Sequence, residues 1–318
     1  MGNTKSKEVM LQKFQEILGA DHVFPEEPMA KHITFRVGGP AEWFLRVDTA
    51  EQLKQVIAFC KEQEVPYYVI GNGSDLLVSD AGVQGAILHL EGEFAEITAK
   101  ENVNDGICDV CVGAGVMLAS LSLRAGKKGF TGLEFANGIP GTVGGAVLMN
   151  AGAYGGEIKD TIVAADVMTK DGEIRRLEKE ELKLSYRHSA IMESGDIVLR
   201  AYFSLKVRPK LQIFAIMESY RKARQEKQPL EYPSAGSTFK RPVGYFAGKL
   251  IQDAGLSGCK IGGAQVSTKH AGFVINAGGA TAADVYHLIQ HIKVTVKEKF
   301  QVELEPEVRF LGEFNEIK

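Results

Sequence analysis

Apolar residues recur at helical spacing in several stretches of the chain, and these stretches predict its main helices. The longest begins after Thr281 and Asp284, a pair typical of a helix N-terminus, and six apolar residues then share one face. These six are Val285, Leu288, Ile289, Ile292, Val296 and Phe300. The same spacing predicts four further helices, over residues 10–18, 50–63, 211–228 and 245–254.

Short runs of β-branched and aromatic residues predict strands between these helices. WFLRV and PYYVI bracket the helix over 50–63, which favours a β-α-β start, and Asp48 followed by Glu51 predicts the capping residues of that helix. From Gly85 to Val207 short strands alternate with glycine and acidic turns, which indicates a second, sheet-dominated part. The polar run KQPLEYPSAGS then precedes a small α/β part.

Length and composition support a folded protein of several parts. A chain of 318 residues exceeds one typical domain of about 100–200 residues, so we expect two or three folding units. The hydrophobic fraction of 45% and charged fraction of 24% are ordinary for a globular protein and argue against a disordered or fibrous one. A net charge of −3 provides no basic face for nucleic acid.

The sequence predicts a cytoplasmic protein without a metal. The first thirty residues lack the pattern of an export signal, and no apolar run approaches the ~20 residues that span a bilayer. We therefore expect reduced thiols. Cys108 and Cys111 form a Cys-x-x-Cys pair, but in a strand positions three apart point to opposite faces. His287 and His291 are one helical turn apart without the acidic residue of a zinc protease, which favours two solvated side chains.

Two glycine-rich segments are candidates for binding a ligand through the backbone. The sequence GNGSD from Gly71 to Asp75 follows a predicted strand, where it could bind an anion or simply form a tight turn. The stretch from Gly138 to Gly156, GIPGTVGGAVLMNAGAYGG, contains seven glycines, each costing up to ~1 kcal/mol relative to alanine. This cost favours a flat or phosphorylated ligand over turn packing, although the spacing matches neither a Rossmann fold nor a P-loop.

Three polar segments offer candidate catalytic groups. They are SYRHS over 185–189, AGSTFKR over 235–241 and EPEVR over 305–309. Each also has an ordinary structural interpretation. Arg187 could belong to a surface ion pair, Ser237 could be a turn residue after glycine, and Glu307 could be a solvated strand residue.

Taken together in this order, the two glycine loops, YRHS, GSTFKRP and LEPEVRFLG resemble the UDP-N-acetylenolpyruvoylglucosamine reductase (MurB) family. The resemblance runs from HITFRVGG at His32 to RFLG at Gly312. It implies an α+β fold, with an FAD-binding domain of the vanillyl-alcohol oxidase/PCMH type in two subdomains and a C-terminal α/β substrate-binding domain. The boundaries it implies are residues 1–90 with 302–318, 91–210 and 211–301.

The resemblance also implies roles for individual residues. Arg187, Ser237 and Glu307 match the family's active-site arginine, proton donor and active-site carboxyl group. The cofactor-binding residues that it implies are Gly71, Asn72, Gly73, Ser74, Asp75, Leu76, Leu77, Gly138, Ile139, Pro140, Gly141, Thr142, Gly144, Gly145, Asn150, Ala151 and Gly152. The substrate-binding residues that it implies are Tyr154, Lys240, Arg241 and His270.

Two features resemble the second, shorter type within this family. Arg241 stands where the first type has asparagine, and YFSLK at Tyr202 runs into the next helix without the first type's inserted segment. The implied reaction is reduction of UDP-N-acetylglucosamine enolpyruvate to UDP-N-acetylmuramate, with non-covalent FAD and with NADPH as co-substrate. We expect a monomer that binds neither nucleic acid nor membrane. A flavin oxidase of the same fold and a non-catalytic nucleotide-sugar binder remain alternatives.

Overall fold

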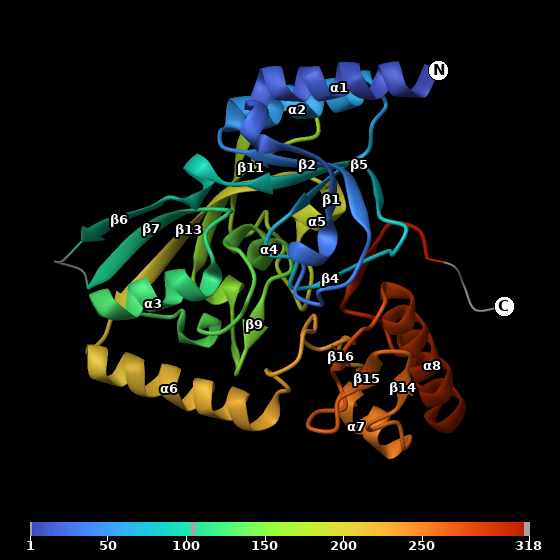
Figure 1. Ribbon diagram of the computed structural model, residues 1–318. Helices are drawn as coiled ribbons and strands as arrows, with labels where there is room; N and C mark the ends of the chain where they lie inside the picture. Colours follow the sequence, from blue (N-terminus) through green and yellow to red (C-terminus); the bar gives the residue numbers. More distant parts are fainter. Residues whose placement is uncertain (1, 103–105, 315–318) are drawn as a thin grey trace. The chain divides into compact units, whose positions relative to one another are not determined.

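The computed structural model describes residues 2–102 and 106–314 (Figure 1), and the chain forms two compact units. The first unit comprises Met1–Pro25, Trp43–Gly71 and Gly85–Lys222. The second unit comprises Glu26–Glu42, Asn72–Gln84 and Ala223–Lys318. Each unit is therefore assembled from segments that are far apart in the sequence. The domain boundaries expected from the sequence stay a prediction.

Two helices of the first unit pack side by side (Figure 1). They are α1 (Gly2–Leu18) and α2 (Ala50–Glu62). The ring of Phe14 on α1 is buried and packs against Trp43 and Phe59, with ring centroids 5.6 and 5.3 Å apart. The helical spacing of the apolar residues therefore predicted both helices and their buried faces, but α1 begins at Gly2, before the predicted range of 10–18.

The capping residues of α2 lie one position later than the sequence predicts. Thr49 and Gln52 form the capping box, in which the Gln52 backbone N–H donates to the Thr49 hydroxyl (3.2 Å) and the Gln52 side chain accepts from the Thr49 N–H. Asp48 instead lies 3.0 Å from the His22 ring through its carboxylate, so it is not the cap. The prediction of Asp48 and Glu51 was wrong because a distant partner engages Asp48.

The first sheet has the strand order β1-β2-β5-β3. Its strands are β1 (Val23–Pro28), β2 (Pro40–Val47), β3 (Tyr67–Ile70) and β5 (Val83–Leu90). Strands β3 and β5 are parallel. Along the chain α2 connects β2 to β3 in the predicted strand-helix-strand order, but β5 lies between these two strands in the sheet.

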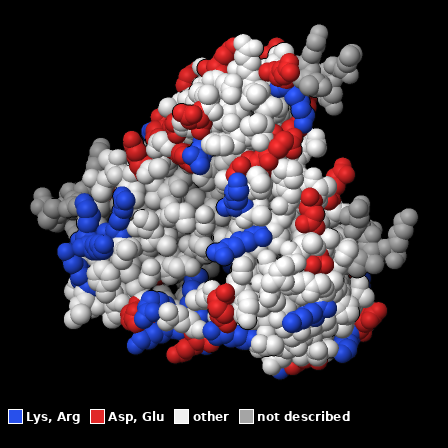
Figure 2. All heavy atoms as spheres, viewed as in Figure 1, with Lys and Arg blue, Asp and Glu red and all other residues white. Residues whose placement is uncertain are grey.

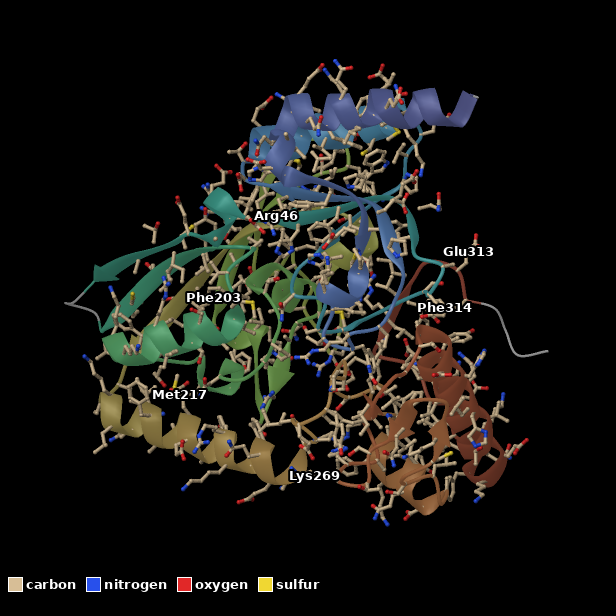
Figure 3. The ribbon with its side chains drawn as sticks, in the orientation of Figure 1. Arg46, Phe203, Met217, Lys269, Glu313 and Phe314 are labelled. Carbon is tan, nitrogen blue, oxygen red and sulfur yellow. The ribbon has the colours of Figure 1, made fainter. Side chains whose placement is uncertain are left out.

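The second sheet is antiparallel and follows the order β12-β11-β13-β7-β6, with β8 also paired to β13. Its strands are β6 (Ile97–Asn102), β7 (Ile107–Gly113), β8 (Phe130–Thr131), β11 (Ile162–Met168), β12 (Ile174–Glu178) and β13 (Ile197–Val207). Burial alternates along much of β13, where Phe203, labelled in Figure 3, is fully buried. Such alternation indicates one face toward the core.

Four helices accompany this sheet. They are α3 (Leu118–Lys128), α4 (Val143–Leu148), α5 (Ala190–Ser194) and α6 (Lys210–Lys227). Helix α6 lies along α3, and Met217, labelled in Figure 3, points from α6 toward it. Ile213 and Met217 are buried at this contact, opposite Gly126 of α3. Two short strands, β9 (Gly152–Ala153) and β10 (Gly156–Glu157), form a tight hairpin after α4.

The second unit contains a three-stranded antiparallel sheet covered by helices. The strands are β14 (Lys260–Ile261), β15 (Ala264–Val266) and β16 (Val274–Asn276), and the helices are α7 (Ala247–Asp253) and α8 (Ala282–Phe300). Helix α8 packs against all three strands and α7 (Figure 1). Its predicted capping box of Thr281 and Asp284 is confirmed. Its predicted apolar face is buried except for Phe300, which is 36% exposed at the helix end.

The same unit contains a parallel pair of strands that joins distant parts of the chain. Strand β4 (Leu76–Val78) pairs with β17 (Arg309–Leu311), the final strand. Five short 3-10 helices complete the described elements, at Ala20–His22, Met29–Lys31, Gly92–Ala95, Glu134–Ala136 and Ile158–Asp160.

Charge on the face drawn in Figure 2 is mixed, with acidic and basic side chains over most elements. Lys and Arg gather beside the end of α3, whose last turn contains Lys127 and Lys128. Cys108 is buried and Cys111 half-buried on β7, and burial raises the pKa of the Cys60 thiol to about 12. Within residues 2–102 and 106–314, no helix has both the length and the apolar character of a membrane span.

Candidate active site

Arg187 lies at the tip of a tight turn in the first unit. The turn runs from Ser185 to His188 and is closed by a hydrogen bond from the His188 N–H to the Ser185 carbonyl (3.2 Å). Arg187 has φ of +53° at the third position, where a type II turn ordinarily requires glycine. A non-glycine residue in this conformation is strained, so the surrounding structure must stabilise it.

The glycine-rich stretch builds α4 and the hairpin after it. Gly144 lies in close contact with the strand end at Ala114, since a Cβ there would come within 2.9 Å of the Ala114 Cβ. Gly152 is similarly close to Glu157 in the β9–β10 hairpin. Close packing therefore explains Gly144 and Gly152, although the number of glycines in this stretch led us to expect mainly a ligand.

Other parts of the stretch are open to a ligand. A Cβ at Gly145 would meet only the Thr142 hydroxyl, at 3.8 Å, so the backbone there is accessible from outside. Gly71 is packed against the same residue, because a Cβ at Gly71 would lie 2.2 Å from the Thr142 hydroxyl. The end of β3 is thereby fixed beside the start of α4.

Ser237 and Glu307 are brought together in the second unit by backbone pairing. The Glu307 N–H donates to the carbonyl of Thr238 (2.9 Å), and the Lys240 N–H donates to the carbonyl of Glu305 (2.9 Å). The two segments therefore run antiparallel, with the residue after Ser237 opposite Glu307. Thr238 is buried and its hydroxyl accepts the Val274 N–H (2.9 Å), whereas Ser237 is exposed. This arrangement anchors the segment and leaves the Ser237 hydroxyl accessible.

The segment 72–77 lies next to Glu307 in the same unit. The Arg309 N–H donates to the Asp75 carbonyl (2.9 Å), at the point where β17 begins to pair with β4. Gly73 has φ of +56° and approaches the chain at His32, where a Cβ would lie 2.3 Å from the carbonyl oxygen. The structure thus places the first glycine loop beside the segment that contains Glu307, although the two are far apart in the sequence.

Tyr154 lies in the β9–β10 hairpin and stacks on Tyr220 of α6. The ring centroids are 4.6 Å apart and the planes differ by 7°. Tyr154 has φ of +54° and remains 38% exposed. The sequence did not indicate Tyr220 as a partner. Its spacing from Ile213 and Met217 marks the buried side of α6, but spacing within one helix cannot identify a contact with a distant hairpin.

Lys240 and Arg241, the basic residues predicted to contact substrate, have different surroundings. The Lys240 ammonium lies 2.5 Å from Glu305 in an exposed ion pair. The Arg241 guanidinium lies 4.0 Å above the ring of Phe246, which is itself 62% exposed. The guanidinium of an arginine is planar and has several donors, which suits it to bind a carboxylate or phosphate.

His270 is half-buried beside the Ser237 segment. Its Nδ1 accepts the Gly272 N–H (3.1 Å), and the Gly272 carbonyl accepts the Thr238 N–H (2.9 Å). Burial lowers the pKa of the His270 imidazole, and the ring packs edge-on against Phe273. The neutral form with its proton on Nε2 satisfies this geometry.

The predicted site residues thus fall into two groups. Ser237, Glu307, Lys240, Arg241, His270 and the loop 72–77 belong to the second unit. Arg187, Tyr154, Gly71 and the segment 138–152 belong to the first. Among the described residues, no group of three or more His, Cys, Asp or Glu side chains could hold a metal ion.

Comparison with known proteins gives the family. Residues 41–178 match the profile of an FAD binding domain, and residues 228–311 match that of the UDP-N-acetylenolpyruvoylglucosamine reductase C-terminal domain. A UDP-N-acetylenolpyruvoylglucosamine reductase from Agathobacter rectalis is 52% identical, covering 91% of this chain and 94% of its own. The chain belongs to the MurB family. The MurB relative from Lachnoclostridium phytofermentans is 50% identical over 96% of this chain and 98% of its own.

A solved MurB structure shares the fold. The crystal structure of UDP-N-acetylenolpyruvylglucosamine reductase (MurB) from Thermus caldophilus is 39% identical, with a TM-score of 0.79 over 91% of this chain and 99% of that one. The expectation of an α+β MurB chain, with an FAD-binding domain followed by a MurB C-terminal domain, is therefore confirmed.

Proposed function

We propose that this chain reduces UDP-N-acetylglucosamine enolpyruvate to UDP-N-acetylmuramate, using bound FAD and NADPH, in the synthesis of peptidoglycan precursors. The observation that carries this proposal is the sequence identity of 50–52% to MurB proteins over more than nine tenths of the chain. The three residues expected to act on the substrate, Arg187, Ser237 and Glu307, are all present. A binder without activity would have no need of all three.

The backbone around the glycine-rich segments fits a flavin. The open side of Gly145 allows a ligand to approach the chain, and Thr142 lies at the start of α4 beside it. We assign residues 71–77, 138–145 and 151–152 to hold FAD. The side-chain amide of Asn150 has both of its N–H groups bonded within the protein and is not assigned to the cofactor. Bound FAD would supply the chemistry for hydride transfer between NADPH and the enolpyruvyl double bond.

Arg187 is suited to stabilise the charge that develops on the substrate. Hydride addition places negative charge on the carbon that bears the carboxylate, and a guanidinium is permanently charged with several donors. A preorganised donor at such a position contributes about 3–4 kcal/mol to lowering the barrier. The turn that holds Arg187 at φ of +53° provides this preorganisation.

Ser237 is suited to donate the proton that completes the reduction. A serine hydroxyl is a weak acid, but it can protonate a strongly basic carbanion when it is held against it. Ser237 is exposed after Gly236, which has φ of +73°. Glu307, opposite the next residue, can orient or polarise the same intermediate.

We further propose that the chain is a cytoplasmic monomer of the second, shorter MurB type. The type is supported by the connection from β13, which ends at Val207, to α6, which begins at Lys210. This connection has no room for the first type's inserted segment. The cytoplasm is supported by the use of NADPH, and size-exclusion chromatography with light scattering tests the monomer.

Replacing Ser237 by alanine tests the proposed function directly. We expect Ser237→Ala to leave the reduction of FAD by NADPH nearly unchanged, because this half-reaction needs no proton from Ser237. Oxidation of the reduced flavin by the enolpyruvyl substrate should slow by roughly 10²-fold or more, the usual scale for loss of a general acid. Anaerobic stopped-flow absorbance separates the two half-reactions.

The exposed Ser257 provides a matched control in the same unit. Ser257→Ala should leave both rates unchanged. Equal slowing of both half-reactions in Ser237→Ala would refute the assignment of Ser237. If the reduced flavin of the purified protein reoxidises rapidly in air but the enolpyruvyl sugar is not turned over, the protein is a flavin oxidase. If the purified protein has no flavin absorbance, it is a nucleotide-sugar binder.

A further inference from the structure

Asn150 ends α4 in a conformation that ordinarily belongs to glycine. It has φ of +42°, its N–H donates to the Val147 carbonyl (3.2 Å), and the following N–H of Ala151 donates to the Ala146 carbonyl (2.8 Å). These two bonds make a Schellman motif, in which glycine is the usual residue at the position of Asn150. A side chain at this position therefore requires a separate explanation.

The Asn150 side chain is fully buried and bonded within the protein. Its Nδ2 donates to the Glu157 carboxylate (2.5 Å) and to the Ser185 carbonyl (3.0 Å), while its Oδ1 accepts the Lys159 N–H (3.0 Å). Both partners of Nδ2 are acceptors and the partner of Oδ1 is a donor, so the amide orientation is fixed by its contacts. This side chain has no donor left for a flavin.

The contact with Ser185 ties Asn150 to the turn that carries Arg187. The Ser185 carbonyl accepts both the Asn150 amide and the His188 N–H that closes the turn. At the other end of the turn, the buried Ser189 hydroxyl donates to the carbonyl of Leu148 (2.7 Å), the last residue of α4. The end of α4 therefore holds the turn at both of its ends.

We propose that Asn150 and Ser189 are positioning residues that hold Arg187 in its left-handed conformation for the reaction. This inference rests on the proposed function and adds two residues to it. Arg187 occupies a conformation that a side chain rarely adopts unless its surroundings impose it. Two hydrogen bonds to the end of α4 impose this conformation on the turn, one made by the Asn150 amide and the other by the Ser189 hydroxyl. A displaced guanidinium would lose the alignment on which its contribution to the rate depends.

The substitution Asn150→Gly isolates the side chain, because glycine is the residue that a Schellman motif prefers and the helix end is retained. We expect the second half-reaction, flavin oxidation by the enolpyruvyl substrate, to slow by about 10- to 100-fold, as for a misaligned catalytic group. FAD content and FAD reduction by NADPH should change by less than about twofold. Gln301→Gly is the matched control, since Gln301 also ends a helix with positive φ (57°) but lies exposed on α8.

A double-mutant cycle with Arg187→Ala distinguishes positioning from a general structural role. If Asn150 acts through Arg187, adding Asn150→Gly to Arg187→Ala should slow the second half-reaction by less than about twofold. A loss of the same size in both backgrounds would overturn the proposal. Ser189→Ala provides an independent second variant, and it should show the same non-additivity with Arg187→Ala.

Hydrogen exchange gives a readout that does not depend on activity. The His188 amide, bonded to the Ser185 carbonyl, should exchange faster in Asn150→Gly than in the unmodified protein, while amides in the β11–β13 pairing keep their protection. Unchanged exchange at His188 would overturn the proposal. Absence of turnover in the unmodified protein would refute the proposed function, and hydrogen exchange would still decide whether Asn150 holds the turn.

Discussion

His270 shows how burial at a single residue changes the chemistry of the site. Its Nδ1 accepts the backbone N–H of Gly272, and its ring is half-buried against Phe273. Protonation would therefore place a charge in a poorly solvated position and break the hydrogen bond from Gly272. The lowered pKa of the imidazole follows from this burial. A neutral His270 leaves Nε2–H as a donor, which suits contact with a carboxylate or phosphate oxygen.

The lowered pKa predicts a dependence of stability on pH. In the unfolded chain histidine titrates near ~6.5. As the pH falls below this value, the unfolded chain binds a proton that the folded protein does not, so the free energy of unfolding decreases. We expect His270→Gln to remove this component, so that stability falls less between pH 7.5 and 5.5 than it does in the unmodified protein. Urea unfolding monitored by circular dichroism at the two pH values measures this.

Ser267→Ala is the control for this measurement. The Ser267 hydroxyl accepts the backbone N–H of His270 (3.3 Å) and of Lys269 (3.2 Å), so its loss loosens the same turn without removing the imidazole. Its stability should be lower by a similar amount at both pH values. If the free energy of unfolding falls equally between pH 7.5 and 5.5 in His270→Gln and in the unmodified protein, His270 is not the source of the pH dependence.

At the scale of elements, the start of α8 depends on a residue far away in the chain. Besides its own capping box, α8 receives the Asp80 carboxylate, which accepts the N–H groups of Ala282 and Ala283 at 2.8 Å each. Asp80 lies two residues after the end of β4, so its carboxylate connects the β4–β17 strand pair to α8. A negative group at a helix N-terminus also interacts favourably with the helix dipole.

Replacing Asp80 by alanine should destabilise the second unit. We expect the free energy of unfolding to fall by about 1 kcal/mol, as for loss of a helix cap, with the flavin site otherwise intact. Chemical denaturation of purified Asp80→Ala measures this. Asp253→Ala removes a carboxylate from an exposed pair with Lys249 and should cost less than about 0.5 kcal/mol. Equal effects of the two substitutions would show that Asp80 does not cap α8.

The elements show which information the sequence contains about the fold. Periodicity located α2, α6 and α8 to within a few residues, because the apolar face of each is set by local spacing. The placement of β5 between β2 and β3 and the capping of α8 by Asp80 were not predictable, because both depend on partners distant in the chain. For the same reason the sequence predicted Asp48 as the cap of α2, whereas the structure has Thr49.

At the scale of the whole molecule, each unit is built from three separate segments. The sequence suggested the residues of the candidate site only as separate motifs, and their resemblance to a family supplied the roles. The structure adds why Ser237 lies near Glu307, namely the backbone pairing of residues 238–240 with 305–307. It also adds Tyr220 and the bonds of Asn150, which depend on side-chain contacts that no motif records.

Binding of FAD should stabilise the whole protein. A ligand that binds only the folded state at 100 times its dissociation constant adds about 2.7 kcal/mol to the free energy of unfolding. For a chain of this size that corresponds to a rise in Tm of roughly 5 °C. Differential scanning fluorimetry of flavin-depleted protein, with and without FAD, measures the shift. Riboflavin, which lacks the phosphates, is the control and should raise Tm less, whereas an unchanged Tm with FAD would contradict the cofactor assignment.

The pairing of β4 with β17 has a consequence for the synthesis of the protein. Strand β4 pairs only with β17 among the described strands, and the Ser79 hydroxyl just after it donates to the Glu313 carbonyl, 234 positions later. During translation β4 emerges from the ribosome early and has no strand partner until the last residues of the chain follow. A nascent or prematurely terminated chain therefore lacks this strand pair and leaves an open strand edge that a chaperone can bind.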